Sequence, residues 1–247
     1  MTFDTYQDQS NLLTFIMRWT GEKNMHYDNT VKAVFLKRPN RFIAQVNLNG
    51  EIETVHVKNT GRCKELLLPQ SKVILSKSDN PARKTKYDLV AVEKAELGLV
   101  NIDSQAPNAL MKEWLTGKFD VIKPEYKYGK SRIDFYLEKG SRKYLVEVKG
   151  CTLEKDGVGY FPDAPTLRGV KHIYELIEAH KKGFRCALAF VIQMPEVTEV
   201  NPNGRIHPEF ETAFEEAVKA GVKIWFIGCS VTENSLIPDT NRIKVEF

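Results

Sequence analysis

Three side chains in the second half of the sequence, Asp134, Glu147 and Lys149, have the types and spacing of a metal-dependent site. Asp134 lies in the alternating run 132–137, on the face opposite to its apolar neighbours. Glu147 and Lys149 are two residues apart in the run 145–149 and share one face, because side chains alternate along a strand. If the two runs form neighbouring strands, two carboxylates and one ammonium group meet at one end of a sheet.

The chemistry that these groups could perform is the hydrolysis of a phosphodiester with a bound metal ion. Asp134 and Glu147 carry hard oxygen ligands for Mg²⁺ or Mn²⁺, and the backbone carbonyl of Val148 could complete the ligands from the protein. Lys149 would orient the attacking water or stabilise charge on the phosphate. Glu113, in the helix predicted before these strands, is a further candidate acid. A solvent-exposed hairpin on which Glu and Lys alternate gives the same pattern, so both interpretations stay open on these residues alone.

The elements that must position these residues follow an α/β rhythm over residues 100–247. Apolar periodicity and stop signals predict helices over 107–115, 166–182 and 209–220, and strands over 133–137, 144–148, 186–192 and 222–227. The run 186–192 is apolar throughout, which is typical of a strand buried on both faces. The order αβββαβ around the candidate site indicates one α/β domain with a mixed sheet.

Residues 25–99 follow a different pattern, with about five short alternating runs bounded by polar turns. The pair Asn49-Gly50 separates two of these runs and predicts a two-residue hairpin turn. Short strands in this number favour a small closed barrel, and the OB type is the common small barrel that binds oligonucleotides. An SH3-like barrel is the alternative.

Positive charge is concentrated in the predicted barrel. Residues 25–100 hold 13 basic and 8 acidic residues, whereas residues 101–247 hold 21 of each. This distribution favours contact of the barrel with a polyanion, although an ordinary solvated surface gives the same count. The candidate phosphate contacts are Lys37, Arg38, Arg41, Lys58, Arg62 and Lys64, and Phe35 and Phe42 are either stacking platforms or core residues.

The helix predicted over 166–182 has a polar face that could turn toward the candidate site. Glu175 lies on this face, and Asp163, just before the helix, is predicted to cap its first turn. The candidate nucleic-acid contacts on the same helix are Arg168, Lys171 and His172.

Composition places the chain among soluble globular proteins, with 42% hydrophobic and 28% charged residues. Four cysteines lie far apart without zinc-type spacing, which predicts free thiols in a reducing compartment. No apolar run reaches the about 18 residues of a membrane helix, and the N-terminal stretch lacks the features of a secretory signal. We therefore expect a cytoplasmic protein. Residues 1–24 are predicted to be an N-terminal extension with one short amphipathic helix over 10–19.

Several short blocks occur in a fixed order along the chain. They are Asn59 to Arg62, Ser78 to Asn80, Tyr126 to Gly129, Arg132 to Phe135, Glu147 to Lys149, Gly159 to Ala164 and Arg168 to His172. Together they resemble the sugar fermentation stimulation protein family. The resemblance implies an OB-like N-terminal domain over 25–99, a restriction-endonuclease-like domain of the D…E-x-K superfamily over 100–247, and binding to DNA. It also implies an indirect association with sugar metabolism.

These observations predict a DNA-binding protein with a divalent-metal-dependent nuclease site and Mg²⁺ or Mn²⁺ as its cofactor. Binding should tolerate many sequences, because the basic excess lies in a barrel without a helix that reads a groove. RNA is the alternative nucleic acid, no membrane contact is expected, and a homodimer is compatible with the sequence. The alternative function is a non-catalytic DNA-binding regulator linked to sugar metabolism, which retains the nuclease-like fold without turnover.

Overall fold

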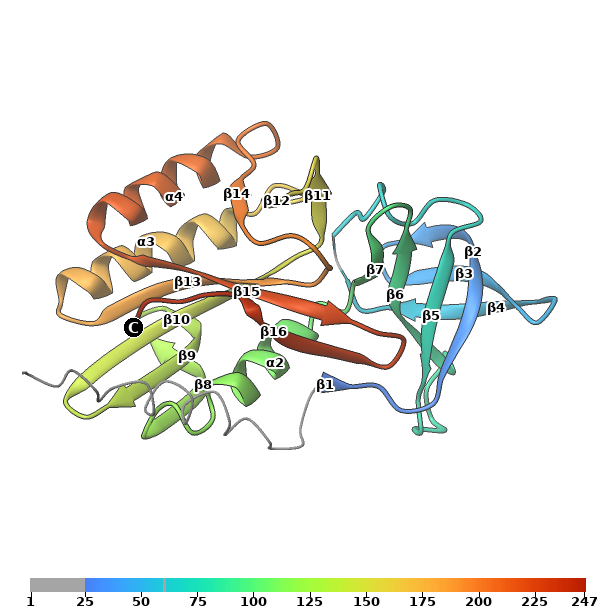
Figure 1. Ribbon diagram of the computed structural model, residues 1–247, viewed down its shortest axis with the longest axis horizontal. Helices are drawn as coiled ribbons and strands as arrows, with labels where there is room; N and C mark the ends of the chain where they lie inside the picture. Colours follow the sequence, from blue (N-terminus) through green and yellow to red (C-terminus); the bar gives the residue numbers. More distant parts are fainter. Residues whose placement is uncertain (1–24, 60) are drawn as a thin grey trace, which may run out of the picture.

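The computed structural model describes residues 25–59 and 61–247, which form a β-barrel and a larger α/β body side by side (Figure 1). The helix predicted over residues 10–19 lies outside the described residues. The described chain starts with β1 (Met25–His26), which pairs with the last strand of the α/β body before the chain enters the barrel. It leaves the barrel through β7 (Gly98–Asn101), so two segments connect the two domains.

The barrel is built from five strands in the order β4-β3-β2-β5-β6, and a short parallel pairing of β4 with β6 closes it. Asn49 and Gly50, with φ angles of 55° and 92°, form the predicted two-residue turn between β3 and β4. The closed barrel predicted from the alternating runs is confirmed. The strands are β2 (Thr30–Asn40), β3 (Ile43–Leu48), β4 (Glu51–Val57), β5 (Lys72–Lys77) and β6 (Tyr87–Lys94).

Alternation along the strands determines which barrel side chains form the core. Phe35, Val46 and Val55 point inward and are at most 2% exposed. Phe42, in the turn after β2, is 45% exposed. Of the two aromatic candidates, Phe35 is therefore a core residue, and Phe42 alone presents its ring at the surface.

Seven strands form the sheet of the α/β body, in the order β1-β16-β15-β13-β10-β9-β8. The central strands β10, β13 and β15 are parallel to one another, and the outer strands pair antiparallel, which confirms the predicted mixed sheet. β13 is buried at every position after Arg185, as its apolar run predicts. The bounds are β8 (Val121–Tyr128), β9 (Ser131–Lys139), β10 (Arg142–Cys151), β13 (Arg185–Ile192), β15 (Lys223–Val231) and β16 (Ser235–Lys244).

Helices cover both faces of this sheet (Figure 1). Leu110 and Met111 of α2 (Ala106–Leu115) share a core with Phe135, whereas Ile173 of α3 (Leu167–Lys181) packs with Phe190 in the core of the opposite face. α4 (Pro208–Ala220) lies beside α3 in the same layer. The three helices predicted from periodicity are therefore present, and β10 lies between the two helical layers.

The cap of α3 differs from the prediction. The hydroxyl of Thr166 accepts a hydrogen bond from the backbone N–H of Gly169 at 3.1 Å, so Thr166 caps the helix. Asp163 instead accepts a hydrogen bond from the backbone N–H of Arg62 in the barrel at 3.1 Å. The predicted cap at Asp163 was wrong, because this carboxylate binds a residue that is far away in the sequence.

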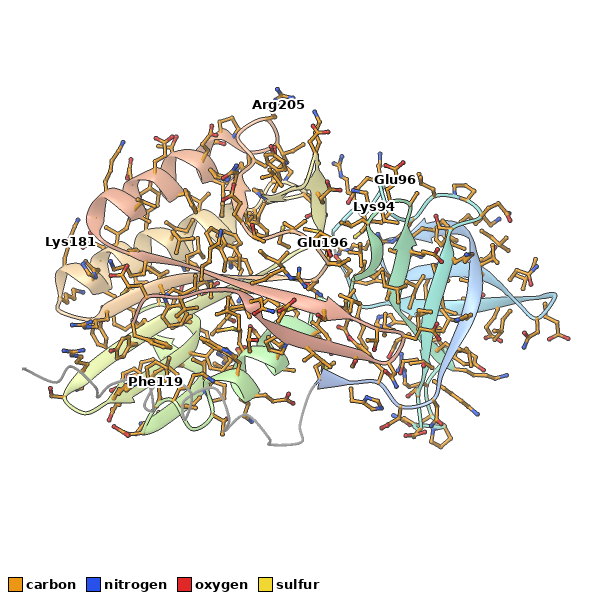
Figure 2. All side chains as sticks on the ribbon, in the orientation of Figure 1. Lys94, Glu96, Phe119, Lys181, Glu196 and Arg205 are labelled. Atoms are coloured by element: carbon orange, nitrogen blue, oxygen red, sulfur yellow. The ribbon has the colours of Figure 1, made fainter. Side chains whose placement is uncertain are left out.

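The junction between the two domains is held by several polar contacts. The backbone N–H of Asn101 donates to the Gln193 carbonyl at 2.9 Å, and the Gln193 side chain donates back to the Asn101 side chain at 2.8 Å. Lys94 of the barrel donates to the backbone carbonyl of Glu154 at 3.0 Å; Figure 2 shows Lys94 on the barrel side of the junction and Glu196 on the α/β side. Glu154 belongs to a small sheet beside the barrel, formed by β11 (Leu153–Lys155), β12 (Val158–Phe161) and β14 (Val200–Pro202).

Candidate functional site

The candidate carboxylates come from two neighbouring strands, at the place where the strands separate. The antiparallel pairing of β9 with β10 ends at Val146. Asp134 lies one residue before Phe135, the β9 partner of Val146, and its Oδ2 atom accepts a hydrogen bond from the backbone N–H of Val148 at 2.7 Å. The N–H of Val148 thus binds the Asp134 side chain in place of a backbone carbonyl of β9. This bond places Asp134 close to Glu147.

Glu147 is almost completely enclosed, with 2% of its surface exposed. Its Oε1 atom accepts hydrogen bonds from Lys149 Nζ, at 2.6 Å, and from His172 Nδ1. Burial by itself raises the pKa of Glu147, but the charge of Lys149 and the hydrogen bond from His172 outweigh burial and hold the pKa below its ordinary value. The other oxygen, Oε2, is buried and has no hydrogen-bond partner among the described residues.

Asp134 is partly buried and is fixed from two sides. Asn108 of α2 donates to its Oδ1 atom at 2.9 Å, in addition to the bond from Val148. Burial and the negative charge of Glu147 raise the pKa of Asp134 to about 6. The two carboxylates are therefore near enough to repel each other, and a cation between them would relieve that repulsion.

The oxygen atoms of this site fit a hard divalent cation such as Mg²⁺. Glu147 supplies a buried anionic oxygen without a partner, and Asp134 supplies a second carboxylate. In a strand, the N–H and the C=O of one residue point to the same side. The N–H of Val148 points toward Asp134, so its carbonyl points to the same side, past the last backbone pair of β9 and β10. The described residues contain no group of three or more His, Cys, Asp and Glu side chains that could hold a metal. The residues present match Mg²⁺, which takes one or two carboxylates and keeps several waters.

α3 contributes a basic groove beside Glu147. His172 is 4% exposed, and Arg168 Nε lies 3.5 Å from His172 Nε2, so the predicted polar face of this helix does turn toward the carboxylates. A groove of about 430 Å³ separates the first turn of α3 from the turn between β8 and β9. Four cations line it: Lys130, Arg132, Arg168 and Lys171.

Two of these cations have acidic neighbours. Arg132 lies 3.7 Å from Glu125, and Lys171 lies 3.7 Å from Glu175. The Arg132–Glu125 pair is well exposed, and exposed pairs of this length are weak in water, whereas the Glu175 side chain is only 21% exposed. Four cations face these two carboxylates, so the groove keeps a net positive charge. A groove of this charge beside two carboxylates suits a phosphate chain whose reacting group lies at the carboxylates.

Asn108 of α2 contacts the site through Asp134, and it was not among the predicted site residues. A pattern signal was present, because asparagine is disfavoured inside helices and its side chain often takes a specific hydrogen bond. Glu113, the predicted residue of this helix, lies five positions later and thus about 140° around the helix axis from Asn108. Its side chain is partly buried, and its role stays a prediction.

The predicted phosphate contacts of the barrel divide into two groups. The guanidinium of Arg38 donates to the backbone carbonyls of Arg41, Asn59 and Gly61, at 2.6–2.9 Å, and so holds a loop. Lys58 lies 3.1 Å from the buried carboxylate of Asp88. Both cations thus have partners within the protein: Arg38 binds backbone carbonyls of a loop, and Lys58 binds a buried carboxylate, which needs a charged or polar partner. The exposed cations, which form no ion pair with described residues, are Lys37, Arg41, Arg62 and Lys64.

The four cysteines are buried and unpaired, as their spacing predicts. Burial raises the pKa of Cys151, the cysteine nearest to Lys149 in the sequence, to about 12. A buried thiol of this kind is unreactive at neutral pH. Within the described residues, no helix has the length and apolar character needed to cross a membrane.

The fold and the site together define a class of protein, in which an OB-type barrel precedes a restriction-endonuclease-like α/β domain that carries a D…E-x-K trio. Two family descriptions match the chain: the SfsA N-terminal OB domain over residues 36–102, and the sugar fermentation stimulation protein RE domain over residues 105–235. The chain belongs to the sugar fermentation stimulation protein family, as its sequence blocks predict.

Relatives and a solved structure share both domains with this chain. Sugar fermentation stimulation protein homologs from Clostridium beijerinckii and Desulfitobacterium hafniense are 48% and 50% identical over 217 and 216 residues. Each alignment covers 86% of this chain. It covers 96% of the Clostridium beijerinckii protein and 94% of the Desulfitobacterium hafniense protein. The structure of Pyrococcus furiosus SfsA in complex with Ca²⁺ is 26% identical, with a TM-score of 0.76 over 88% of this chain and 99% of that chain.

Proposed function

We propose that this protein binds DNA and hydrolyses its phosphodiester bonds with a divalent cation held by Asp134 and Glu147. The observation that carries the proposal is the buried Oε2 atom of Glu147, an anionic oxygen with no partner among the described residues, next to a second carboxylate. An unpaired buried charge is costly, and a cation offsets that cost. The Ca²⁺ complex of Pyrococcus furiosus SfsA supports the proposal, because Ca²⁺ and Mg²⁺ both prefer oxygen ligands.

The residues around the carboxylates have separate tasks in this mechanism. Asp134 and Glu147 would hold a Mg²⁺ or Mn²⁺ ion, which would supply an acidified water and offset charge on the phosphate. Lys149 and His172 both occupy Oε1 of Glu147, which leaves Oε2 as the oxygen for the cation. Asn108 fixes the orientation of Asp134. The side chain of Lys149 is 15% exposed, so its ammonium can also reach a phosphate oxygen.

Substrate binding is assigned to the two basic surfaces. The groove beside α3 carries four cations, and the barrel adds exposed cations such as Arg41 and Arg62. Side chains of this type contact phosphates and carry little base information. We therefore propose binding that tolerates many sequences and weakens steeply with salt.

The test is incubation of the purified protein with end-labelled DNA and RNA, each single- and double-stranded, with Mg²⁺, Mn²⁺ or EDTA. We expect cleavage with either cation and none with EDTA. Glu147→Gln should abolish cleavage and Lys149→Ala should reduce it strongly, because they remove a ligand and a phosphate-stabilising charge. The matched controls Asp156→Asn, in the exposed turn after β11, and Lys143→Ala, exposed on β10, should cleave like the natural protein. Equal cleavage by Glu147→Gln would refute the proposed site.

One observation favours the non-catalytic regulator as a second candidate. The ammonium of Lys149 is already bound to Glu147 at 2.6 Å, so the charge that catalysis needs is partly neutralised. A regulator would bind DNA with the same salt dependence. It would leave the labelled substrates intact with every cation tested, even when the protein is in excess over the substrate. The cleavage assay thus separates the two candidates.

A further inference from the structure

A second hollow lies between the two domains, directly beside the candidate site. This cleft has a volume of about 410 Å³, and its lining includes Arg41, Asn59, Ser104, Gly150, Thr152 and Gln193. Gly150 follows Lys149 on β10, so the cleft opens next to the site. The first turn of α3 separates the two hollows, because Thr166 lines the cleft and Leu167 lines the basic groove.

The two hollows differ in their chemistry. The groove has four cations, whereas the cleft has one cation, Arg41, and one carboxylate, Asp163, which is bound to the backbone of Arg62. The other polar groups of the cleft are amides, hydroxyls and backbone atoms. The hydroxyl of Thr152 makes no hydrogen bond with any described residue. The amide nitrogens of Asn59 and Gln193 already donate to the carbonyls of Ile102 and Asp103, so Thr152 is the hydroxyl of the cleft that stays available to a ligand. Phosphates are contacted mainly through cations, and neutral polar groups can bind base edges and sugars as well as phosphates. The groove is therefore suited to the chain of phosphates and the cleft to an unpaired base.

The size and stiffness of the cleft restrict what can enter it. A volume of about 410 Å³ lies at the lower end of the range for small-molecule pockets, and one nucleotide fits such a space. Its two walls belong to different domains, which are joined by the bonds between Asn101 and Gln193 and between Arg62 and Asp163. These bonds join the two walls, and a base pair with its two backbones is larger than the cleft, so an unpaired nucleotide is the better fit.

An exposed aromatic ring lies at the barrel side of the cleft. The guanidinium of Arg41, which lines the cleft, lies 4.7 Å from the centre of the Phe42 ring, and this ring is 45% exposed. OB barrels bind single strands by stacking bases on aromatic rings beside a positive groove. A base that leaves the cleft could therefore stack on Phe42.

We infer that the substrate is a single strand, or a duplex with an unpaired end, and that the interdomain cleft holds the nucleotide next to the scissile phosphate. The inference rests on the proposed function, because it assigns the substrate class of the same site. It differs in what it requires: an unpaired nucleotide must enter the cleft, whether or not the phosphate is then cleaved.

The experiment compares three fluorescent DNA molecules of one sequence: a single strand, a blunt duplex and a duplex with a single-stranded overhang. Affinity is measured by fluorescence anisotropy with Ca²⁺, and cleavage is measured separately with Mn²⁺. The natural protein should bind the single strand and the overhang about tenfold more tightly than the blunt duplex, the effect of one stacked base. Thr152→Trp, which fills the cleft, should remove this preference and leave the affinity for the blunt duplex unchanged. Thr212→Trp, exposed on α4, should retain the preference.

The outcomes separate this inference from the proposed function. Suppose that the natural protein prefers the unpaired DNA, that Thr152→Trp abolishes this preference, and that no DNA is cleaved in Mn²⁺. This result would support the assignment of the cleft and refute catalysis. Cleavage of all three molecules at equal rates, with equal affinities, would refute the cleft and support catalysis. If Thr152→Trp does not fold, 2-aminopurine at the unpaired end provides the second measurement with the natural protein. Its fluorescence should change when the overhang binds, and an unchanged signal at saturation would overturn the inference.

Discussion

Removal of the imidazole of His172 should destabilise the protein by an amount that its contacts determine. The ring is 4% exposed and donates a hydrogen bond to Glu147, a buried anion. A hydrogen bond to a charged group contributes about 1.5–3 kcal/mol, and Lys149 remains on the same oxygen in the variant. We therefore expect His172→Ala to lower the free energy of unfolding by about 2 kcal/mol, within that range. In a protein of this size, that loss lowers the Tm by roughly 4–8 °C.

The assay is thermal and urea unfolding in EDTA, followed by circular dichroism, with a second histidine as the control. His26 also lies beside a carboxylate, at 3.7 Å from Asp28, but the two side chains are 52% and 81% exposed. His26→Ala should therefore change the stability by less than about 0.5 kcal/mol. If the two variants lose the same stability, the contact of His172 with Glu147 does not support the site, and our account of how Glu147 is held is wrong.

Three further predictions concern the barrel, the junction and the groove. Burial alone would raise the pKa of Asp88, but the hydrogen bonds around it hold that pKa below its usual range. Its contribution to stability is therefore present at neutral pH and lost as the pH falls below about 4, and Asp88→Asn should flatten this acid dependence in urea titrations. Gly61→Ala should cost about 1–3 kcal/mol in thermal unfolding, because the added Cβ would lie 2.4 Å from Asp163 Oδ2. Replacing Arg132 and Lys171 together by Ala should reduce the logarithmic slope of DNA affinity against salt by about 1.4 for a single strand and about 1.8 for a duplex, and an unchanged slope would exclude them as phosphate contacts.

Local patterns in the sequence were sufficient for much of the fold and for the positions of the trio. The alternating runs of the barrel and the periodic helices of the second half depend on neighbours that are close along the chain. The spacing of Glu147 and Lys149 placed them on one face, and the structure joins them at 2.6 Å. Strands without a clear alternation were missed. β8 and β16 contain Pro124 and Pro238, residues that normally argue against a strand, and proline is tolerated in β8 because it is an edge strand.

The roles that could not be predicted depend on partners that are distant in the sequence. Asp163 resembled a helix cap, but its partner, Arg62, is 101 residues away. Arg38 resembled a phosphate contact, but its guanidinium donates hydrogen bonds to backbone carbonyls more than 20 residues away in the sequence. Asn108 carried a weak local signal, and only the folded chain brings it to Asp134. Residue types thus identified the candidate chemistry, whereas the fold decided which charges remain available for a ligand.

The central claim, that Asp134 and Glu147 hold a divalent cation, is tested most directly by a crystal soaked in Mn²⁺ and measured at a wavelength that reveals manganese. We predict an anomalous peak between Asp134 and Glu147 Oε2, at about 2.2 Å from oxygen atoms of both carboxylates. A crystal of Glu147→Gln, soaked in the same way, should lack the peak. Absence of the peak from the natural protein, or an ion held by other residues, would contradict the account.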